Sequence, residues 1–353
     1  MTGRPSSAAR SKPRVSRSEP LKPTLSVIIP VFNEHDHIGG TLQAAAAELQ
    51  GSFKTDFVVV DDGSTDGTAE AALKAGAGSI RVIQQPNQGR LAARRTGLKA
   101  ATGDYVLFLD SRVALDPGGA AFVAERLAKG ELVWNGHVDI ETAGNPYGRF
   151  WKVLTELAFA AYFDDPRTTS FGLKDFDSFP KGTTCFLAPT DLMRRGLEQF
   201  RTGYSDDRNA NDDTPILRWV GSQQVINISP SFSCRYRPRS TLSGFVRHAE
   251  HRGVVFLDGH GHRKSRFFPF VIGFYPLSVV AAVVAIRRPW IGLGLVAGTA
   301  LAAGSVGLAR GKSREDAVSF GVLAPVYVAA HGVGMWRGLM LMLTNRLGQR
   351  PAA

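Results

Sequence analysis

The sequence predicts an α/β domain with a mostly parallel central sheet, followed by C-terminal helices that enter a membrane. Four short β-branched runs alternate with helical segments between residues 24 and 110, a pattern typical of parallel βαβ units. A polar residue follows each run, at the edge of the sheet where ligands usually bind. Residues 267–286, 289–309 and 317–336 contain no Asp, Glu, Lys or Arg. Each stretch is long enough to cross a bilayer core, which takes about 20 residues.

Composition narrows the possible partners. The chain has 353 residues, enough for more than one hydrophobic core, and its two cysteines exclude a disulfide scaffold and a cysteine-rich zinc module. The net charge of +11 suggests an anionic partner. Much of the excess falls on the N-terminal tail, on residues 235–266 and on the loops beside the apolar stretches. No basic stripe alternates with aromatic residues elsewhere, so we expect membrane lipids rather than nucleic acid.

Residues 1–22 are rich in Ser, Pro, Arg and Lys, and we expect them to form a disordered basic tail. No apolar run follows these charges, so the tail does not resemble a secretory signal peptide. A solvated arm is the simpler interpretation, and attraction to anionic lipid is the alternative.

The predicted strands are rich in Val, Ile and Leu, as expected for strands buried in a parallel sheet. Turn residues separate them from the helical segments. The strands are expected at residues 25–31, 57–60, 79–83 and 105–109, with helices over about 36–50 and 88–101.

Polar side chains where the four strands end predict one shared ligand site, because the carboxyl ends of parallel strands meet at one edge of a sheet. A single acidic residue there would more often be a helix cap, but four polar ends are hard to explain in that way. The sequence has no Walker A motif, and no G-x-G-x-x-G follows the first strand. These absences argue against a P-loop NTPase and an ordinary dinucleotide-binding dehydrogenase. The polar residues are Asn33, Glu34, Asp61, Asp62, Asn87 and Asp110.

Three segments carry a specific pattern: Ser26–Glu34 (SVIIPVFNE), Val58–Thr68 (VVVDDGSTDGT), and Asn87–Arg90 (NQGR) leading to Gly103–Asp110 (GDYVLFLD). In this order and spacing, they resemble the family-2 glycosyltransferases of the GT-A fold, of the membrane-anchored bacterial type. The resemblance covers about residues 24–230. It implies a GT-A domain over residues 23–233 that binds a nucleotide-sugar donor.

By this resemblance, the ends of the first two strands hold the base and ribose of the donor. A carboxylate there can accept the N3–H of uracil, and we favour a UDP-sugar over a GDP- or dTDP-sugar. The Gly89-Arg90 turn is expected to pack under the nucleotide. The donor-binding residues that the resemblance implies are Pro30, Phe32, Glu34, Asp62, Asn87, Asp110 and Arg112.

The resemblance also implies a catalytic base. An inverting transferase removes the proton of the acceptor hydroxyl with one carboxylate, which in this family is the second acid of a Glu-Asp pair. Here the pair is Asp212-Asp213, and we expect Asp213 to be the base, with Asp206-Asp207 as a lesser candidate. Taken alone, Asp213 before Thr214-Pro215 would indicate a helix N-cap.

The sequence departs from the family at the metal site. Relatives usually carry Asp-x-Asp after the fourth strand, where the last acid helps to bind Mg²⁺ or Mn²⁺, but this chain has Asp110-Ser111-Arg112. Arginine has only donors and cannot ligate a cation. Either Asp110 holds a metal with another partner, or Arg112 itself binds the diphosphate. We therefore expect weakened or absent dependence on a divalent cation.

Residues 234–266 are expected to form an amphipathic interfacial segment, because Leu242, Phe245, Val246 and Ala249 recur on one helical face among basic residues. A solvated basic face is the simpler alternative, and contact with a phosphorylated lipid acceptor is another. His248 and His251 are spaced like metal ligands, but no third ligand is evident.

Residues 267–345 are expected to hold two or three transmembrane helices. Pro269 and Pro276 make the first stretch imperfect, and it could be re-entrant. If Lys264 and Arg266 lie inside, the Arg287-Arg288 turn falls outside, against the positive-inside bias. The segment is short for a polymer channel, and Pro215 stands where processive synthases carry a glutamine before Arg-Trp.

The function expected from these features is an inverting glycosyltransferase that moves one sugar from a nucleotide-sugar donor to a lipid-linked or cell-envelope glycan acceptor. It would be a multi-pass membrane protein with a cytoplasmic catalytic domain. A polyprenyl-phosphate sugar transferase is the first alternative. A catalytically inactive membrane scaffold is the second, suggested by the lost acid at Arg112.

Overall fold

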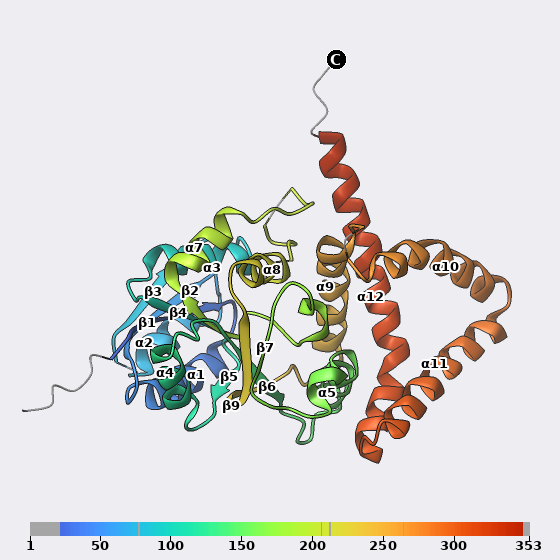
Figure 1. Ribbon diagram of the computed structural model, residues 1–353. Helices are drawn as coiled ribbons and strands as arrows, with labels where there is room; N and C mark the ends of the chain where they lie inside the picture. The colour runs from blue at the N-terminus through green and yellow to red at the C-terminus, as the bar shows by residue number, and fades with distance from the viewer. Residues whose placement is uncertain (1–21, 77, 206, 212, 264, 349–353) are drawn as a thin grey trace, which may run out of the picture.

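The computed structural model describes residues 22–348 apart from 77, 206, 212 and 264. An α/β domain carries the site, and four helices at the C-terminal end of the chain lie to one side of it (Figure 1). The expected tail over residues 1–21 and the expectations for Asp206, Asp212 and Lys264 fall outside the described residues.

Four parallel strands form the first half of the sheet, as the sequence predicts. β1 lies between β2 and β4, and β3 pairs with the outer edge of β2. Seven of the eight residues of β1 are buried, which explains its β-branched composition. The strands are β1 (Thr24–Val31), β2 (Lys54–Asp61), β3 (Ile80–Gln84) and β4 (Tyr105–Leu109).

The second half makes the sheet mixed. β8 runs antiparallel to β4 and to β6, and β9 continues the sheet beside β6, so the strand order is β3-β2-β1-β4-β8-β6-β9-β5, with β7 also paired to β9. These strands are β5 (Val113–Leu115), β6 (Trp134–Ile140), β7 (Thr169–Phe171), β8 (Cys185–Pro189) and β9 (Ile226–Tyr236).

Helices cover both faces of the sheet with separate apolar cores. On one face α1, α2 and α4 bury residues such as Leu42 and Val123, and on the other α3, α7 and α8 bury residues such as Leu98 and Ile216. α5, α6 and the short 3₁₀ turn η1 (Phe176–Ser178) lie in the long connection between β6 and β8. The helices are α1 (His35–Leu49), α2 (Thr68–Lys74), α3 (Arg90–Ala100), α4 (Gly119–Ala128), α5 (Pro146–Ala158), α6 (Ala160–Phe163), α7 (Thr190–Glu198) and α8 (Thr214–Gln223).

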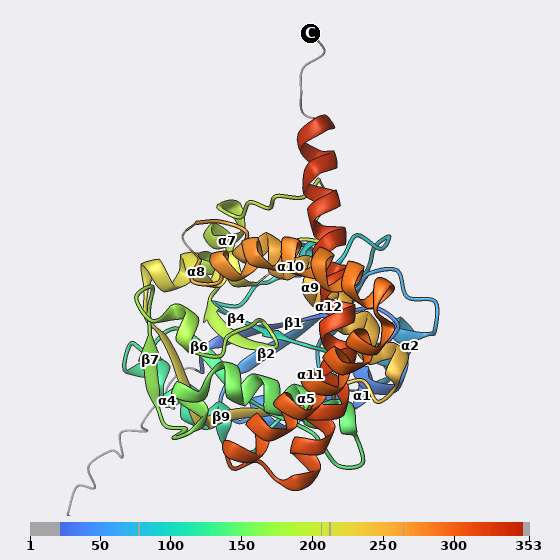
Figure 2. The ribbon, with the colours of Figure 1, turned by 90° about the vertical axis from the view of Figure 1, so that its right-hand side faces the viewer.

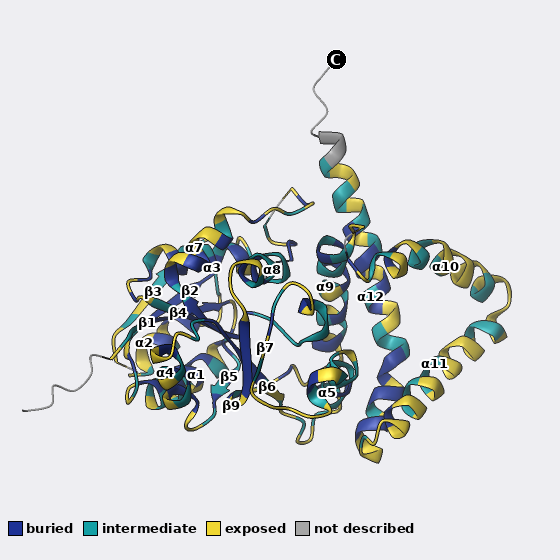
Figure 3. Ribbon diagram, viewed as in Figure 1, coloured by how far each residue is buried: buried dark blue, intermediate teal, exposed yellow. Residues whose placement is uncertain are grey.

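The C-terminal helices begin with α9 (Leu242–His260), followed by α10 (Phe268–Arg287), α11 (Pro289–Ala309) and α12 (Arg314–Gly348). Within the described chain, α10, α11 and residues Arg314–Asn345 of α12 are long and apolar enough to cross a membrane. α10 and α11 leave the rest of the protein as a V and are largely exposed (Figures 1, 2 and 3).

α9 lies between the α/β domain and α12 (Figure 1). Phe245 and Ala249, on the face that the sequence suggests for lipid, are buried, and Phe245 packs among aromatic residues of α5 and α12. Leu242, at the start of the helix, is exposed. Protein rather than open surface therefore covers most of this face.

Candidate active site

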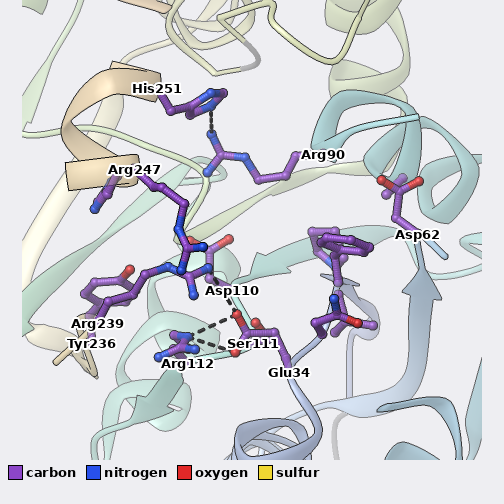
Figure 4. A pocket seen from close by; sticks show the side chains of 16 residues that line it. Glu34, Asp62, Arg90, Asp110, Ser111, Arg112, Tyr236, Arg239, Arg247 and His251 are labelled. Carbon is purple, nitrogen blue, oxygen red and sulfur yellow. Dashed lines mark hydrogen bonds and ion pairs between the residues drawn. The ribbon is translucent and has the colours of Figure 1, made fainter. Parts of the chain in front are cut away.

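A pocket of about 580 Å³ lies at the carboxyl ends of β1, β2 and β4, and α9 with the segment before it forms its opposite wall (Figure 4). This is the edge of the sheet at which the sequence predicts a ligand site. Its lining residues are Pro30, Val31, Phe32, Asn33, Glu34, Asp62, Arg90, Ala93, Asp110, Ser111, Arg112, Tyr236, Arg239, Arg247, His248 and His251.

The structure brings most of the predicted site residues together in this pocket. Asn87 and Asp213 are not among the residues that line it. Those that do line it are Pro30, Phe32, Glu34, Asp62, Asp110 and Arg112.

Hydrogen bonds join the turn after β1 to the turn after β2. Asn33 adopts a left-handed backbone conformation, with φ of 53°, and its side-chain oxygen accepts the backbone N–H of Thr65 at 2.9 Å. In return, the hydroxyl of Ser64 lies 2.9 Å from the backbone nitrogen of Asn33, which donates to it. Phe32, directly before Asn33, lines the pocket and is nearly half exposed.

Asp62 is buried and orders the turn that begins α3. Its carboxylate accepts the backbone N–H of Gln88 at 2.9 Å and that of Gly89 at 2.7 Å, and the side-chain amide of Gln85 at 2.7 Å. Gly89 has φ of 95°, so the chain bends there and α3 starts at Arg90 rather than at the expected residue 88. Asp62 therefore fixes the turn that places Arg90 in the pocket.

Asp110 follows β4 and is held by two donors. The hydroxyl of Thr184 donates to one carboxylate oxygen at 3.0 Å, and Arg94 lies 3.4 Å from the other. The Arg94 side chain is 4% exposed, so it is a buried counter-ion behind the site. No sequence pattern predicts this pair, because Arg94 lies in the middle of α3.

Arg112, which stands where relatives carry an acid, forms an ion pair with Glu34. The Nε atom of Arg112 lies 2.8 Å from a carboxylate oxygen of Glu34, whose side chain is only 7% exposed. Arg239 approaches the other oxygen of Glu34 at 3.6 Å. The negative charge of Glu34 therefore partly neutralises two guanidinium groups, those of Arg112 and Arg239, at the floor of the pocket.

The wall formed by α9 adds positive charge to the pocket. From the sequence, these basic residues are expected to face the membrane surface. Arg239 and Arg247 reach the pocket from this side, and His251 lies 3.3 Å from Arg90 across it (Figure 4). Four arginines thus face three carboxylates around one cavity. The spacing of basic residues between 235 and 252 was the only sign of this wall in the sequence.

His248 is a neutral packing residue of that wall. Its ring lies 4.6 Å from the ring of Trp151, centre to centre. Burial lowers the pKa of His248 well below its usual value, and the nearby charges of Arg252 and Arg90 lower it further. The imidazole is therefore uncharged near neutral pH.

Asn87 does not line the pocket and belongs to the turn that Asp62 orders. A Cβ atom at Gly63 would come within 2.9 Å of the backbone nitrogen of Asn87, and the backbone oxygen of Asn87 accepts a hydrogen bond from Arg208. Asn87 therefore belongs to the support of the Asp62 turn.

Asp213 is the N-cap residue of α8, but its side chain makes no capping hydrogen bond. Its carboxylate accepts a hydrogen bond from the hydroxyl of Thr214 at 3.3 Å and lies beside Gly182, in the loop before β8. The neighbouring Lys181 is tied to the carbonyl oxygen of Phe176 at 2.6 Å, and burial lowers the pKa of Lys181 to about 8.

The donor set does not fit a metal held in the Asp-x-Asp manner. Among the described residues, no three His, Cys, Asp or Glu side chains come together as a metal site. Asp110 is engaged by Arg94 and Thr184, and the second position is a guanidinium that pairs with Glu34. A cation ligand needs an available oxygen lone pair, which Arg112 lacks.

Comparison with known proteins agrees with this architecture. The family model for glycosyl transferase family 2 matches residues 26–192. The undecaprenyl-phosphate 4-deoxy-4-formamido-L-arabinose transferase of Pseudomonas aeruginosa is 33% identical over 159 residues, 43% of this chain and 44% of that protein. Glycosyltransferase AglE of Haloferax volcanii is 38% identical over 91 residues, 25% of this chain and 30% of that protein. The matched stretch thus spans less than half the length of either curated relative.

A solved structure of S. aureus TarS, residues 1–349 in complex with UDP, shares the fold over 93% of each chain, with a TM-score of 0.50 and 17% identity. The matched family motifs run through β1, β2 and β4, whose ends form the pocket. Residues 26–192 therefore form the core of a glycosyl transferase family 2 domain with the GT-A fold.

Proposed function

We propose that the protein transfers one sugar, with inversion, from a nucleotide-sugar donor to a lipid-linked or cell-envelope glycan acceptor, and that the donor is a UDP-sugar. The observation that carries this proposal is the single pocket in which the ends of β1, β2 and β4 meet four arginines. Its volume of about 580 Å³ suits a ligand of nucleotide-sugar size. We place the catalytic domain at the cytoplasmic face of a membrane that the C-terminal helices enter more than once.

The base and ribose of the donor would lie between Phe32 and Asp62. The exposed ring of Phe32 offers an apolar face to a base. Asp62 already accepts three hydrogen bonds from its own chain. A carboxylate has about four acceptor sites, so Asp62 can still accept the N3–H of uracil.

The diphosphate would lie among the guanidinium groups. Glu34 holds the Nε side of Arg112, and the terminal nitrogens of Arg112 are the donors that would bind phosphate oxygens. Arg90, Arg239 and Arg247 supply further positive charge. We propose that these groups replace part of the charge that a divalent cation supplies in relatives, so that donor binding depends weakly or not at all on metal.

Calorimetry of UDP binding tests the replacement of the metal. Wild-type protein should bind UDP almost equally in EDTA and in Mn²⁺, whereas Arg112→Ala should bind about 10- to 100-fold more weakly, since a hydrogen bond to a charged group contributes about 1.5–3 kcal/mol. Arg112→Asp restores Asp-x-Asp and should bind UDP better with Mn²⁺ than with EDTA. Arg167→Ala, at a site 71% exposed on the surface, is the matched control. Wild-type binding lost in EDTA and restored by Mn²⁺, with Arg112→Ala unaffected, would refute the proposal.

We propose Asp213 as the base that takes the proton of an acceptor hydroxyl. Its side chain does not cap α8, and its position beside Gly182 brings it near the loop that precedes β8. Retention of the anomeric configuration in the product would contradict an inverting mechanism with this single carboxylate.

A polyprenyl-phosphate sugar transferase is the second candidate, and the α9 wall favours it. Arg247 and His251 on α9, and Arg239 in the segment before it, line the pocket on the side that packs against α12, where a phosphorylated lipid would approach. The names of two curated relatives also fit such an acceptor. One is the undecaprenyl-phosphate transferase of Pseudomonas aeruginosa. The other is a dodecaprenyl-phosphate galacturonate synthase of Rhizobium johnstonii, 31% identical over 113 residues, 31% of this chain and 33% of that protein.

The two candidates differ in their need for a base. A phosphate nucleophile is already ionised, so Asp213→Asn should abolish transfer to a hydroxyl acceptor and spare much of the transfer to a polyprenyl phosphate. Asp191→Asn, at a side chain 87% exposed on α7, controls for loss of a carboxylate elsewhere. The measurement is sugar transfer from a radiolabelled UDP-sugar to each acceptor in the same detergent.

A further inference from the structure

We infer that α12 lies along the membrane surface, with one face on the catalytic domain and the opposite face in lipid, and does not cross the bilayer. By length and composition, Arg314–Asn345 qualifies as a membrane span. Its contacts with the rest of the chain contradict that role, because they run along nearly the whole helix. The inference concerns the attachment of the protein and does not depend on the proposed reaction.

The inner face of α12 contacts the catalytic domain from one end to the other. Near its start, Asp316 pairs with Arg149 of α5 at 3.0 Å. In the middle, the ring of Tyr327 lies 5.2 Å from that of Phe150, and near the end the side chain of Asn345 donates to the carbonyl oxygen of Gly203 at 3.0 Å. At about 1.5 Å per residue, Asp316 and Asn345 are about 44 Å apart.

A crossing helix with these contacts would draw the catalytic domain into the bilayer. The hydrocarbon core is about 30 Å thick, and about 40–45 Å with the headgroups, so the contacts of α12 would occupy all of it. α9, which packs on α12, carries charged residues along its length, among them Arg247, Glu250 and Asp258. Charged groups at this depth are strongly unfavourable, whereas a helix in the membrane plane leaves them on the aqueous side.

The outer face of α12 is an exposed apolar row with helical spacing. It comprises Val318, Val322, Ala329, Val333 and Met340, and Val318 and Met340 are 63% and 62% exposed. Such a row along one face, opposite a face packed on protein, is the pattern of a helix that lies in a membrane interface.

Lipid is the occupant of this row because it continues the surface of a hairpin that requires lipid. α10 and α11 have mean hydropathies of 2.2 and 1.8 over 18 residues, and only 6% of that stretch is buried in each helix. Both helices lie beside α12 (Figures 1 and 2). The indole of Trp336 donates to the hydroxyl of Ser278 on α10 at 3.1 Å, and Gly321 lies against Ala300 and Gly304 of α11.

Charged groups fix the turn between α11 and α12 at the aqueous side. Lys312 pairs with Glu156 of α5 at 2.8 Å, and Arg310 approaches Asp164 at 3.4 Å. The start of α12 is therefore tied to polar parts of the catalytic domain, and the hairpin enters the bilayer from this level. The pocket residues Arg247 and His251 then lie on α9, the helix that packs directly on α12.

Depth measurements on single cysteines test this inference in the full chain. Val318, Ala329 and Met340 on the outer row are changed one at a time to Cys and spin-labelled, and the protein is placed in vesicles of phosphatidylethanolamine and phosphatidylglycerol. The two native cysteines are buried, which limits background labelling. Power saturation with oxygen and with a water-soluble nickel complex then reports the depth of each label.

In-plane helix geometry predicts that all three labels are accessible to oxygen and lie at one depth, within about 5 Å. A crossing helix predicts that Ala329 lies about 16 Å deeper than Val318 and Met340, since 11 residues of helix separate it from each. That result would overturn the inference, and so would three labels accessible mainly to the nickel complex. Leu73→Cys, on exposed α2, is the aqueous reference, and Leu293→Cys, on α11, is the lipid reference.

Discussion

At the scale of single residues, Arg112 is the decisive departure from the family pattern. A guanidinium in place of a carboxylate would repel a cation, and here it is neutralised by Glu34 and brought to the floor of the pocket. The backbone N–H of Glu34 donates to the hydroxyl of Thr68 at 2.9 Å, and this hydrogen bond holds the backbone of Glu34 in place at the floor of the pocket. One buried acid therefore holds two arginines, Arg112 and Arg239, in position for an anionic ligand.

Removing Glu34 should leave both guanidinium groups uncompensated. Glu34→Ala is expected to lower the free energy of unfolding by about 3–5 kcal/mol, whereas Glu34→Ala combined with Arg112→Ala should cost less than the two single changes added together. Chemical denaturation of the detergent-solubilised protein measures both. Asp36→Ala, at a side chain 89% exposed on α1, should change stability by no more than about 0.5 kcal/mol. A loss for Glu34→Ala as small as that of Asp36→Ala would show that the pair contributes little.

At the scale of elements, the sequence predicts the first half of the sheet well and α9 less well. β1 to β4 follow from their apolar runs, and the residues at their ends share a site because parallel strands place their carboxyl ends together. The face of α9 is set by tertiary contacts that no local pattern contains. The same basic residues suit a membrane surface or an anionic pocket, and only the docking of α9 on α12 turns Arg247 and His251 toward the pocket.

The end of α9 carries a group whose burial makes stability depend on pH. His260 packs against Phe256 and Phe267, its Nδ1 atom lies 2.9 Å from the hydroxyl of Ser265, and burial lowers its pKa to about 4. Between pH 6.5 and 4 the unfolded chain binds a proton at this residue that the folded chain does not. The stabilising contribution is therefore complete above pH 6.5 and is lost as the pH falls toward 4.

His260→Asn should remove this dependence. The melting temperature of the variant should fall less than that of the wild type between pH 6.5 and 4, by a difference equivalent to at most about 3 kcal/mol. Thermal scans at a series of pH values in one detergent measure it. His35→Asn, at a side chain 53% exposed on α1, should keep the wild-type slope. Equal slopes for all three proteins would mean that His260 titrates as it does in the unfolded chain.

At the scale of the whole molecule, α9 belongs both to the site and to the membrane attachment. One flank lines the pocket with Arg247 and His251, and the other crosses α12 where Gly253 meets Gly334. A Cβ atom at Gly334 would overlap the carbonyl oxygen of Glu250 on α9, and one at Gly253 would overlap the carbonyl oxygen of His331 on α12. The two backbones therefore touch, and any change in their separation moves the basic wall of the pocket.

Gly334→Ala tests this coupling. The added methyl group meets a backbone oxygen rather than a flexible side chain, so the helices must separate, and overpacking of this kind costs about 1–3 kcal/mol. We expect a lower melting temperature together with weaker UDP binding, because the displaced α9 carries Arg247 and His251 away from the other arginines. Gly298→Ala on α11 is the matched control, since a Cβ atom there meets nothing within 4 Å, and it should leave both quantities unchanged or slightly raise stability. If Gly334→Ala loses stability but binds UDP as the wild type does, the membrane helices support the fold without positioning the pocket.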